Sequence, residues 1–223
     1  MTFSIIARCP ASGQFGAAVA SSSPAVASRC IRARQGVGAA VSQCITDPKL
    51  GPMLLDLMAQ GHTPQAAVNA LQGEAFIEYR QLMAIDAHHS AVIFTGAAAL
   101  GTLSSAIGQD AACAGNMLAT RDVPQAMLAA FEHTQGSLAE RLMQALIAGE
   151  QAGGEEGPVH SAGLLVYGEV SWPMIDLRMD WVEDDPIAAL AAAWTVYAPQ
   201  LQDYLTRARD PRAAPSFGVP GNL

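Results

Sequence analysis

The chain has 223 residues, of which 51% are hydrophobic and 14% charged, and its formal net charge is −8. A chain of this length can bury a substantial core within one large domain. Its few basic residues are scattered, which excludes a face that neutralises phosphates, so we expect neither nucleic acid nor an anionic membrane surface as a partner.

The apolar residues are interrupted throughout by polar residues and turn formers. No run reaches the roughly eighteen residues that indicate a transmembrane span. The N-terminus has no basic region followed by an apolar segment and a cleavage site, so we expect a cytoplasmic protein. The low charged fraction, with abundant Ala and Gly, indicates surface that is hidden in a homo-oligomer.

The chain begins with strand-like segments. Residues 2–8 and 14–22 flank a Gly-containing turn, which is typical of a hairpin. Residues 36–45 predict a further strand of small apolar residues.

Two helices and a second hairpin follow. One helix begins near Pro48, and another begins with Thr63 as its cap and Pro64 in its first turn. Residues 79–86 and 90–95 predict two strands joined by the turn Asp-Ala-His-His.

The second half of the chain continues this alternation of strands and helices. Strands are expected at 106–114, 160–168 and 173–180. Helices are expected at 122–134, 137–151 and 186–207. Ser137 and Glu140 make a capping box for the second of these helices.

Strands that arrive in hairpin pairs favour antiparallel sheets over a doubly wound parallel sheet. Paired helices between blocks of strands indicate an α+β layered sandwich, in which two central sheets have helices outside. No linker or internal repeat interrupts residues 1–207, which we treat as one domain. The Pro- and Gly-rich residues 208–223 are expected to be a disordered tail or an arm on a neighbouring subunit.

Several ordered stretches together resemble the family called domain of unknown function 1028, a branch of the N-terminal-nucleophile (Ntn) hydrolase superfamily. They are TFSIIAR at 2–8, AAVASSS at 17–23, ARQGVGAAVSQ at 33–43, LGPMLLDLMAQG at 50–61, AGNML at 114–118, GSLAERLMQAL at 136–146, SAGLLV at 161–166 and IDLRMD at 175–180. Each is weak alone, but the ordered set covers nearly the whole chain. The resemblance implies a four-layer αββα sandwich, and a nucleophile that is the first residue of the mature chain.

Thr2 is the residue that this resemblance makes the nucleophile after removal of Met1. A Thr hydroxyl needs an adjacent base, and a free α-amino group, with an ordinary pKa of roughly 7.7–8.0, supplies one on the same residue. The alternative is that Thr2 is only the first residue of a strand.

Five further residues are candidates for the site. Ser21 stands where superfamily relatives such as the proteasome β subunits place an acidic group, and a serine cannot supply that charge. Arg34 lies near the position of their basic residue, which lowers the pKa of the amine, although it can equally be a solvated arginine.

The other three candidates are polar residues beside strands. Gln43 can offer an amide to an oxyanion or make a strand-end hydrogen bond. Asn116 can orient the substrate or the amine, or be a turn residue. Ser161 can hydrogen-bond the amine, as a serine does in the proteasome subunits, or be an ordinary strand-start residue.

The histidines and cysteines show no metal-ligand spacing, and no dinucleotide or phosphate-binding glycine motif is present, so we expect neither metal nor cofactor. Two functions therefore stay open. The first is an amidohydrolase that cleaves a small amide or peptide-like bond through an acyl-enzyme on Thr2. The second is a non-catalytic protein that binds a small molecule or assembles a complex on the same fold.

Overall fold

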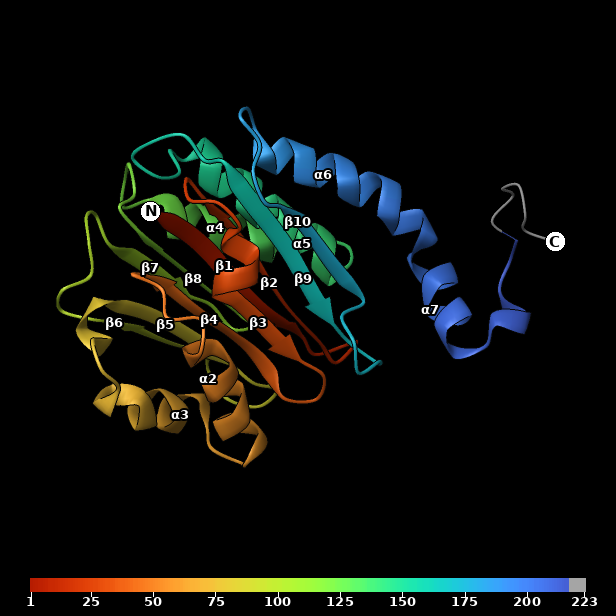
Figure 1. The fold of residues 1–223 in the computed structure, drawn as a ribbon, viewed down its shortest axis with the longest axis horizontal. Helices are drawn as coiled ribbons and strands as arrows, with labels where there is room; N and C mark the ends of the chain where they lie inside the picture. Colours follow the sequence, from red (N-terminus) through yellow and green to blue (C-terminus); the bar gives the residue numbers. More distant parts are fainter. Residues whose placement is uncertain (217–223) are drawn as a thin grey trace.

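Two antiparallel sheets lie face to face with helices on both outer faces (Figure 1). The structure is a computed structural model, and it describes residues 1–216. One sheet has six strands in the order β10-β9-β2-β1-β8-β7, and the other has four in the order β3-β4-β5-β6. This confirms the expected α+β architecture of four αββα layers.

The strands of the six-stranded sheet are β1 (Thr2–Cys9), β2 (Gln14–Ser21), β7 (Ser104–Ile107), β8 (Ala111–Asn116), β9 (Ser161–Tyr167) and β10 (Ile175–Met179). Those of the four-stranded sheet are β3 (Ile31–Arg34), β4 (Gly38–Cys44), β5 (Arg80–Ile85) and β6 (Val92–Thr95). The helices are α1 (Val26–Cys30), α2 (Leu50–Ala59), α3 (Pro64–Ala70), α4 (Val123–His133), α5 (Leu138–Gln151), α6 (Pro186–Tyr197) and α7 (Leu201–Arg209). Helices α2 and α3 cover the four-stranded sheet, whereas α4, α5 and α6 cover the six-stranded one (Figure 1).

Strand β1 shows how the sequence builds these layers. Successive side chains of a strand point to opposite faces of the sheet. Phe3 and Ile5 therefore pack into the core beneath α4 and α5, whereas Ile6 packs between the two sheets. Thr2 and Ser4 share the face of Ile6, so β1 places its hydroxyls between the sheets at its N-terminal end.

Close approach of helix α1 to the six-stranded sheet depends on a glycine. A Cβ atom at Gly163 in β9 would lie 2.3 Å from the Cβ atom of Ala27 in α1. Only a residue without a side chain therefore lets α1 pack at this depth.

The expected hairpins and helix caps are present. Strand β1 pairs with β2, β5 with β6, and β9 with β10, all antiparallel. The capping box of Ser137 and Glu140 begins α5, and the Thr63 hydroxyl accepts the Ala66 N–H at the start of α3.

Three segments differ from the sequence-based expectation. Residues 106–114, expected as one strand, form the end of β7, a turn and most of β8. The helix expected over 186–207 is two helices, because Pro199 lies between them and has no N–H for a continuous helix. Helix α1 and strand β3, within 26–34, were not predicted, since both are too short to show a period.

The expected tail at 208–223 lies partly outside the described residues. Within the described part, α7 continues to Arg209 and a single 3₁₀ turn covers Pro211–Ala213. Residues 217–223 lie outside it. None of the helices within residues 1–216 has the length and apolar character that crossing a bilayer requires.

Candidate functional site

Thr2 lies at the N-terminal end of a central strand, between β2 and β8. It faces Asn116 of β8 across the ladder, and only 4% of its surface is exposed. The two residues are directly opposite each other in an antiparallel pair, so their side chains share one face of the sheet. Ser4, two residues along, hydrogen-bonds to Gln43 of the other sheet, which identifies that face as the one between the sheets.

Two hydroxyl groups hold the carbonyl oxygen of Met1. The Thr2 Oγ1 hydroxyl donates to it, and Ser21 Oγ donates to the same oxygen at 2.5 Å. The two hydroxyl oxygens are themselves 3.4 Å apart. Ser21 Oγ also accepts the backbone N–H of Ser23 at 3.1 Å, which fixes the Ser21 side chain. The Met1–Thr2 peptide thus covers the Thr2 hydroxyl and occupies its hydrogen bonds.

A carboxylate that the sequence analysis missed lies beside the chain terminus. Glu155 Oε2 is 4.0 Å from the Met1 amine and accepts from the Ser22 hydroxyl at 3.2 Å. Its side chain is fully buried, and its Oε1 has no hydrogen-bond partner. Burial raises the pKa of Glu155 to about 7, opposed by the positive charge of the terminal amine. An acidic group therefore does stand at this site, but it comes from the loop before β9 and not from position 21.

Backbone contacts fix the position of this glutamate. Glu155 forms an isolated β-bridge with Leu118, and the Glu156 N–H donates to the Met117 carbonyl at 3.0 Å. The loop is therefore attached to the chain just after Asn116, which is the residue opposite Thr2.

A buried chain of amide side chains connects the two sheets next to Thr2. The Ser4 hydroxyl donates to Gln43 Oε1 at 2.6 Å, and Gln43 Nε2 donates to Gln81 Oε1 at 2.8 Å and to the Ala114 carbonyl at 3.2 Å. Both N–H groups of Gln43 are thus engaged, which favours the strand-end hydrogen-bonding role over that of an oxyanion donor.

Asn116 joins the same amide chain with one half of its side chain. Its Nδ2 donates to Gln81 Oε1 at 3.4 Å, whereas its buried Oδ1 has no partner. An unsatisfied buried acceptor is costly. Asn116 is therefore an available acceptor on the face that carries Thr2.

Ser161 stabilises the turn that carries Ser21 and Ser23. Its hydroxyl donates to the Ser23 carbonyl at 2.6 Å and accepts the Val26 N–H at 3.3 Å. Ser161 also faces Ser21 across the β2–β9 ladder. It reaches Thr2 only through this turn, so its role in the structure is positional.

Arg34 is not brought to this group of residues. It ends β3, where its guanidinium forms an exposed ion pair with Asp56 of α2 at 2.7 Å. It lies opposite Gly38, whereas Gln43 lies at the other end of β4.

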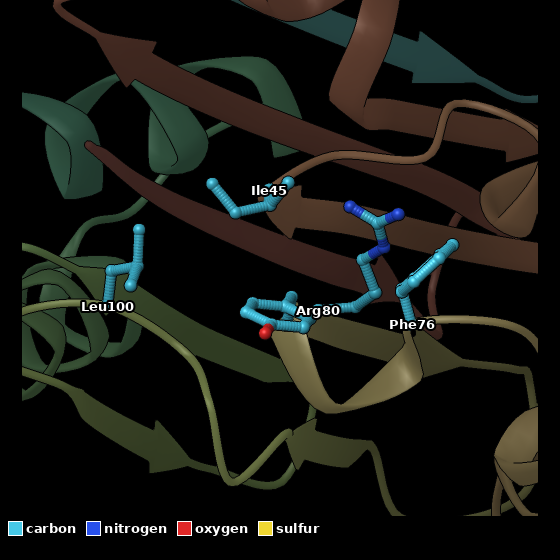
Figure 2. A pocket seen from close by; sticks show the side chains of 5 residues that line it. Ile45, Phe76, Arg80 and Leu100 are labelled. Carbon is cyan, nitrogen blue, oxygen red and sulfur yellow. The ribbon is translucent and has the colours of Figure 1, made fainter.

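A pocket of about 470 Å³ opens beside the start of β5 (Figure 2). It is lined by Ile45, Phe76, Tyr79, Arg80 and Leu100. The Leu100 carbonyl accepts the Met117 N–H at 3.1 Å, and Met117 directly follows Asn116. The pocket wall and the strand opposite Thr2 are therefore directly connected.

Left-handed backbone conformations cluster around this pocket. Cys44, Phe76 and Met117 have φ values of 72°, 61° and 50°, which are uncommon for residues other than glycine. Such strain concentrates at functional sites. Within residues 1–216, no group of three or more His, Cys, Asp or Glu side chains is placed to hold a metal ion.

Comparison with protein families and with solved structures shows what this chain is similar to. The family model described as "Family of unknown function (DUF1028)" matches residues 2–190. A crystal structure of a Silicibacter pomeroyi protein assigned to DUF1028 is 33% identical, with a TM-score of 0.82, over 88% of this chain and 89% of that one.

A more distant structural match is BPH from Thiobacillus denitrificans in complex with epoxomicin. It is 12% identical, with a TM-score of 0.41, over 75% of this chain and 98% of that one. None of the curated proteins matches this chain.

Proposed function

The chain belongs to the DUF1028 family, and from that premise we propose that it is an N-terminal-nucleophile amidohydrolase acting through Thr2. One observation carries this proposal. The Thr2 hydroxyl lies in a buried polar site, where its hydrogen bonds are taken up by the carbonyl of the one residue that processing would remove.

Removal of Met1 converts this arrangement into a nucleophile with its own base. Thr2 is small enough at the second position for a methionine aminopeptidase to accept it. Hydrolysis of the Met1–Thr2 bond frees both hydroxyls from the Met1 carbonyl and creates an α-amino group on Thr2 itself. The unprotonated amine then takes the hydroxyl proton, directly or through one water.

The reaction is an acyl transfer in two stages. Thr2 Oγ1 attacks the carbonyl carbon of the amide, the C–O ester bond forms, the C–N bond breaks, and the amine returns the proton to the leaving nitrogen. Water then attacks the ester, the amine again carries the proton, and release of the carboxylic acid restores the Thr2 hydroxyl. No cofactor enters this balance.

The surrounding side chains support these steps by position. Ser21 Oγ lies 3.4 Å from Thr2 Oγ1 and can hold that hydroxyl once Met1 is gone. The unpartnered Asn116 Oδ1 is an acceptor for the new amine. Glu155 Oε2 lies 4.0 Å from the amine of Met1, and burial raises the pKa of this carboxyl group.

The test is acylation of Thr2, followed by intact mass spectrometry. We expect the purified protein to lack Met1 and to gain one adduct from a β-lactone that acylates N-terminal threonines. Thr2→Ala should abolish the adduct. Thr2→Ser should retain it, because the hydroxyl and the amine are both preserved.

Thr195→Ala is the matched control, since Thr195 is an exposed threonine on α6 and should leave acylation unchanged. Retention of Met1 in the purified protein would contradict the proposal. So would a processed protein in which Thr2 gains no adduct from the β-lactone. That result would favour the non-catalytic binding or assembly protein. The expected homo-oligomer is a separate prediction, which size-exclusion chromatography with light scattering checks.

A further inference from the structure

Four large apolar side chains are exposed around one guanidinium. Among the described residues, nine large apolar side chains are exposed, and four of them, Ile45, Phe76, Tyr79 and Leu100, line the pocket that also contains Arg80. Phe76 is 65% exposed. Exposed apolar side chains that gather in one place mark a binding surface, whereas scattered ones do not.

Arg80 has no acidic neighbour in this pocket. Its Nε is buried and has no hydrogen-bond partner. Arg8 and Arg178, in contrast, are each paired with an aspartate, at 2.8 Å and 2.6 Å. In Figure 2 the guanidinium of Arg80 points from the start of β5 along the pocket, with Phe76 beside it. A positive group with unused donors among apolar walls is complementary to a carboxylate on an apolar body.

Strand pairing and hydrogen bonds link the walls of the pocket to the site of Thr2. Arg80 directly precedes Gln81, whose Oε1 accepts from Asn116 Nδ2, and Asn116 lies opposite Thr2. On the other wall, the Leu100 N–H donates to Cys44 Sγ at 3.4 Å, and Cys44 faces Arg80 in the β4–β5 ladder. The segments that line this pocket are therefore bonded to the segments that surround the nucleophile.

We infer that the pocket binds the free carboxylate of an acidic amide, of the kind found in N-acyl amino acids with an apolar or aromatic side chain. Arg80 binds the carboxylate with two parallel N–H donors, and Phe76 and Tyr79 contact the apolar body. The inference rests on the proposed function only in treating this ligand as a substrate.

The test is calorimetric binding to the Thr2→Ala protein, in which turnover cannot occur. The probes are N-acetyl-L-phenylalanine and N-acetyl-L-phenylalaninamide, which differ only in the carboxylate. We expect the acid to bind at least tenfold more tightly than the amide. Arg80→Gln should reduce this preference to less than twofold. Phe76→Ala should lower the affinity for both probes by the same factor.

Arg178→Gln is the matched control, because Arg178 is also a strand arginine but lies on β10 in an ion pair with Asp176. It should keep the tenfold preference. Equal binding of the two probes, no binding of either, or a preference that survives Arg80→Gln would overturn the inference. So would conversion of an oligomer to a monomer by Phe76→Glu, since the patch would then be a contact between copies.

This result is independent of the acylation of Thr2. A preference for the acid without acylation retains the carboxylate site and rejects the hydrolase. Acylation without a preference for the acid retains the hydrolase and rejects the carboxylate site.

Discussion

Glu155→Gln should make the protein more stable at pH 8 and remove part of the pH dependence of its stability. The Glu155 carboxylate is buried, and its Oε1 has no hydrogen-bond partner. Burial raises its pKa from an ordinary 4.5 to about 7, and the nearby charge of Glu150 acts in the same direction. The terminal amine and the hydrogen bonds from Ser22 act in the opposite direction.

The sign follows from proton binding in the two states. A raised pKa in the folded state means that the folded protein holds the proton more tightly than the unfolded chain. The contribution to stability is therefore fully present below pH 4.5, and it is lost as the pH rises toward the folded pKa of about 7. At about 1.36 kcal/mol for each pKa unit, the loss in the free energy of unfolding is about 3 kcal/mol.

The assay is urea unfolding at a series of pH values from about 4.5 to 8.5, for the parent protein and for Glu155→Gln. Glutamine cannot ionise, so the variant should lack this loss and be more stable than the parent at pH 8 by up to about 3 kcal/mol. Glu156→Gln is the matched control, because Glu156 is the exposed neighbour in the same loop. Equal pH slopes in the parent and in Glu155→Gln would refute the reasoning, as would a variant less stable than the parent at pH 8.

Two substitutions test how the polar site and its support are built. Gln43→Leu leaves the buried Ser4 hydroxyl without its acceptor. The free energy of unfolding, measured with urea, should therefore fall by about 2–4 kcal/mol. A loss below about 1 kcal/mol would show that the amide chain does not hold the sheets together. Gly163→Ala places a Cβ atom 2.3 Å from that of Ala27. This clash should lower the free energy of unfolding by about 1–3 kcal/mol. An unchanged melting temperature would show that α1 can shift away from β9 without loss of stability.

Local patterns determined much of the fold from sequence. The β-rich run at 2–8, which ends at a turn, identified β1. Ser137 and Glu140 located the start of α5, because a capping box needs only residues three apart. The order of hairpins and helix pairs then left few architectures other than the sandwich.

Local patterns also have a limit, which the short and interrupted elements show. Helix α1 and strand β3 are too short to show a period, and their positions depend on packing against β9 and β4. The break between α6 and α7 lies at Pro199, but the helical pattern of α6 and of α7 led the sequence analysis to predict one continuous helix.

The sequence by itself determined the nucleophile candidate and the strand that carries it. Only the tertiary structure decided its surroundings: Glu155 is brought to the chain terminus, Arg80 to a pocket beside Asn116, and Arg34 to a surface ion pair. The physical reason is that a strand's pattern encodes which side chains face inward, whereas their partners come from segments that are distant in the chain, such as Asn116 opposite Thr2 and Gln43 opposite Ser4 between the sheets.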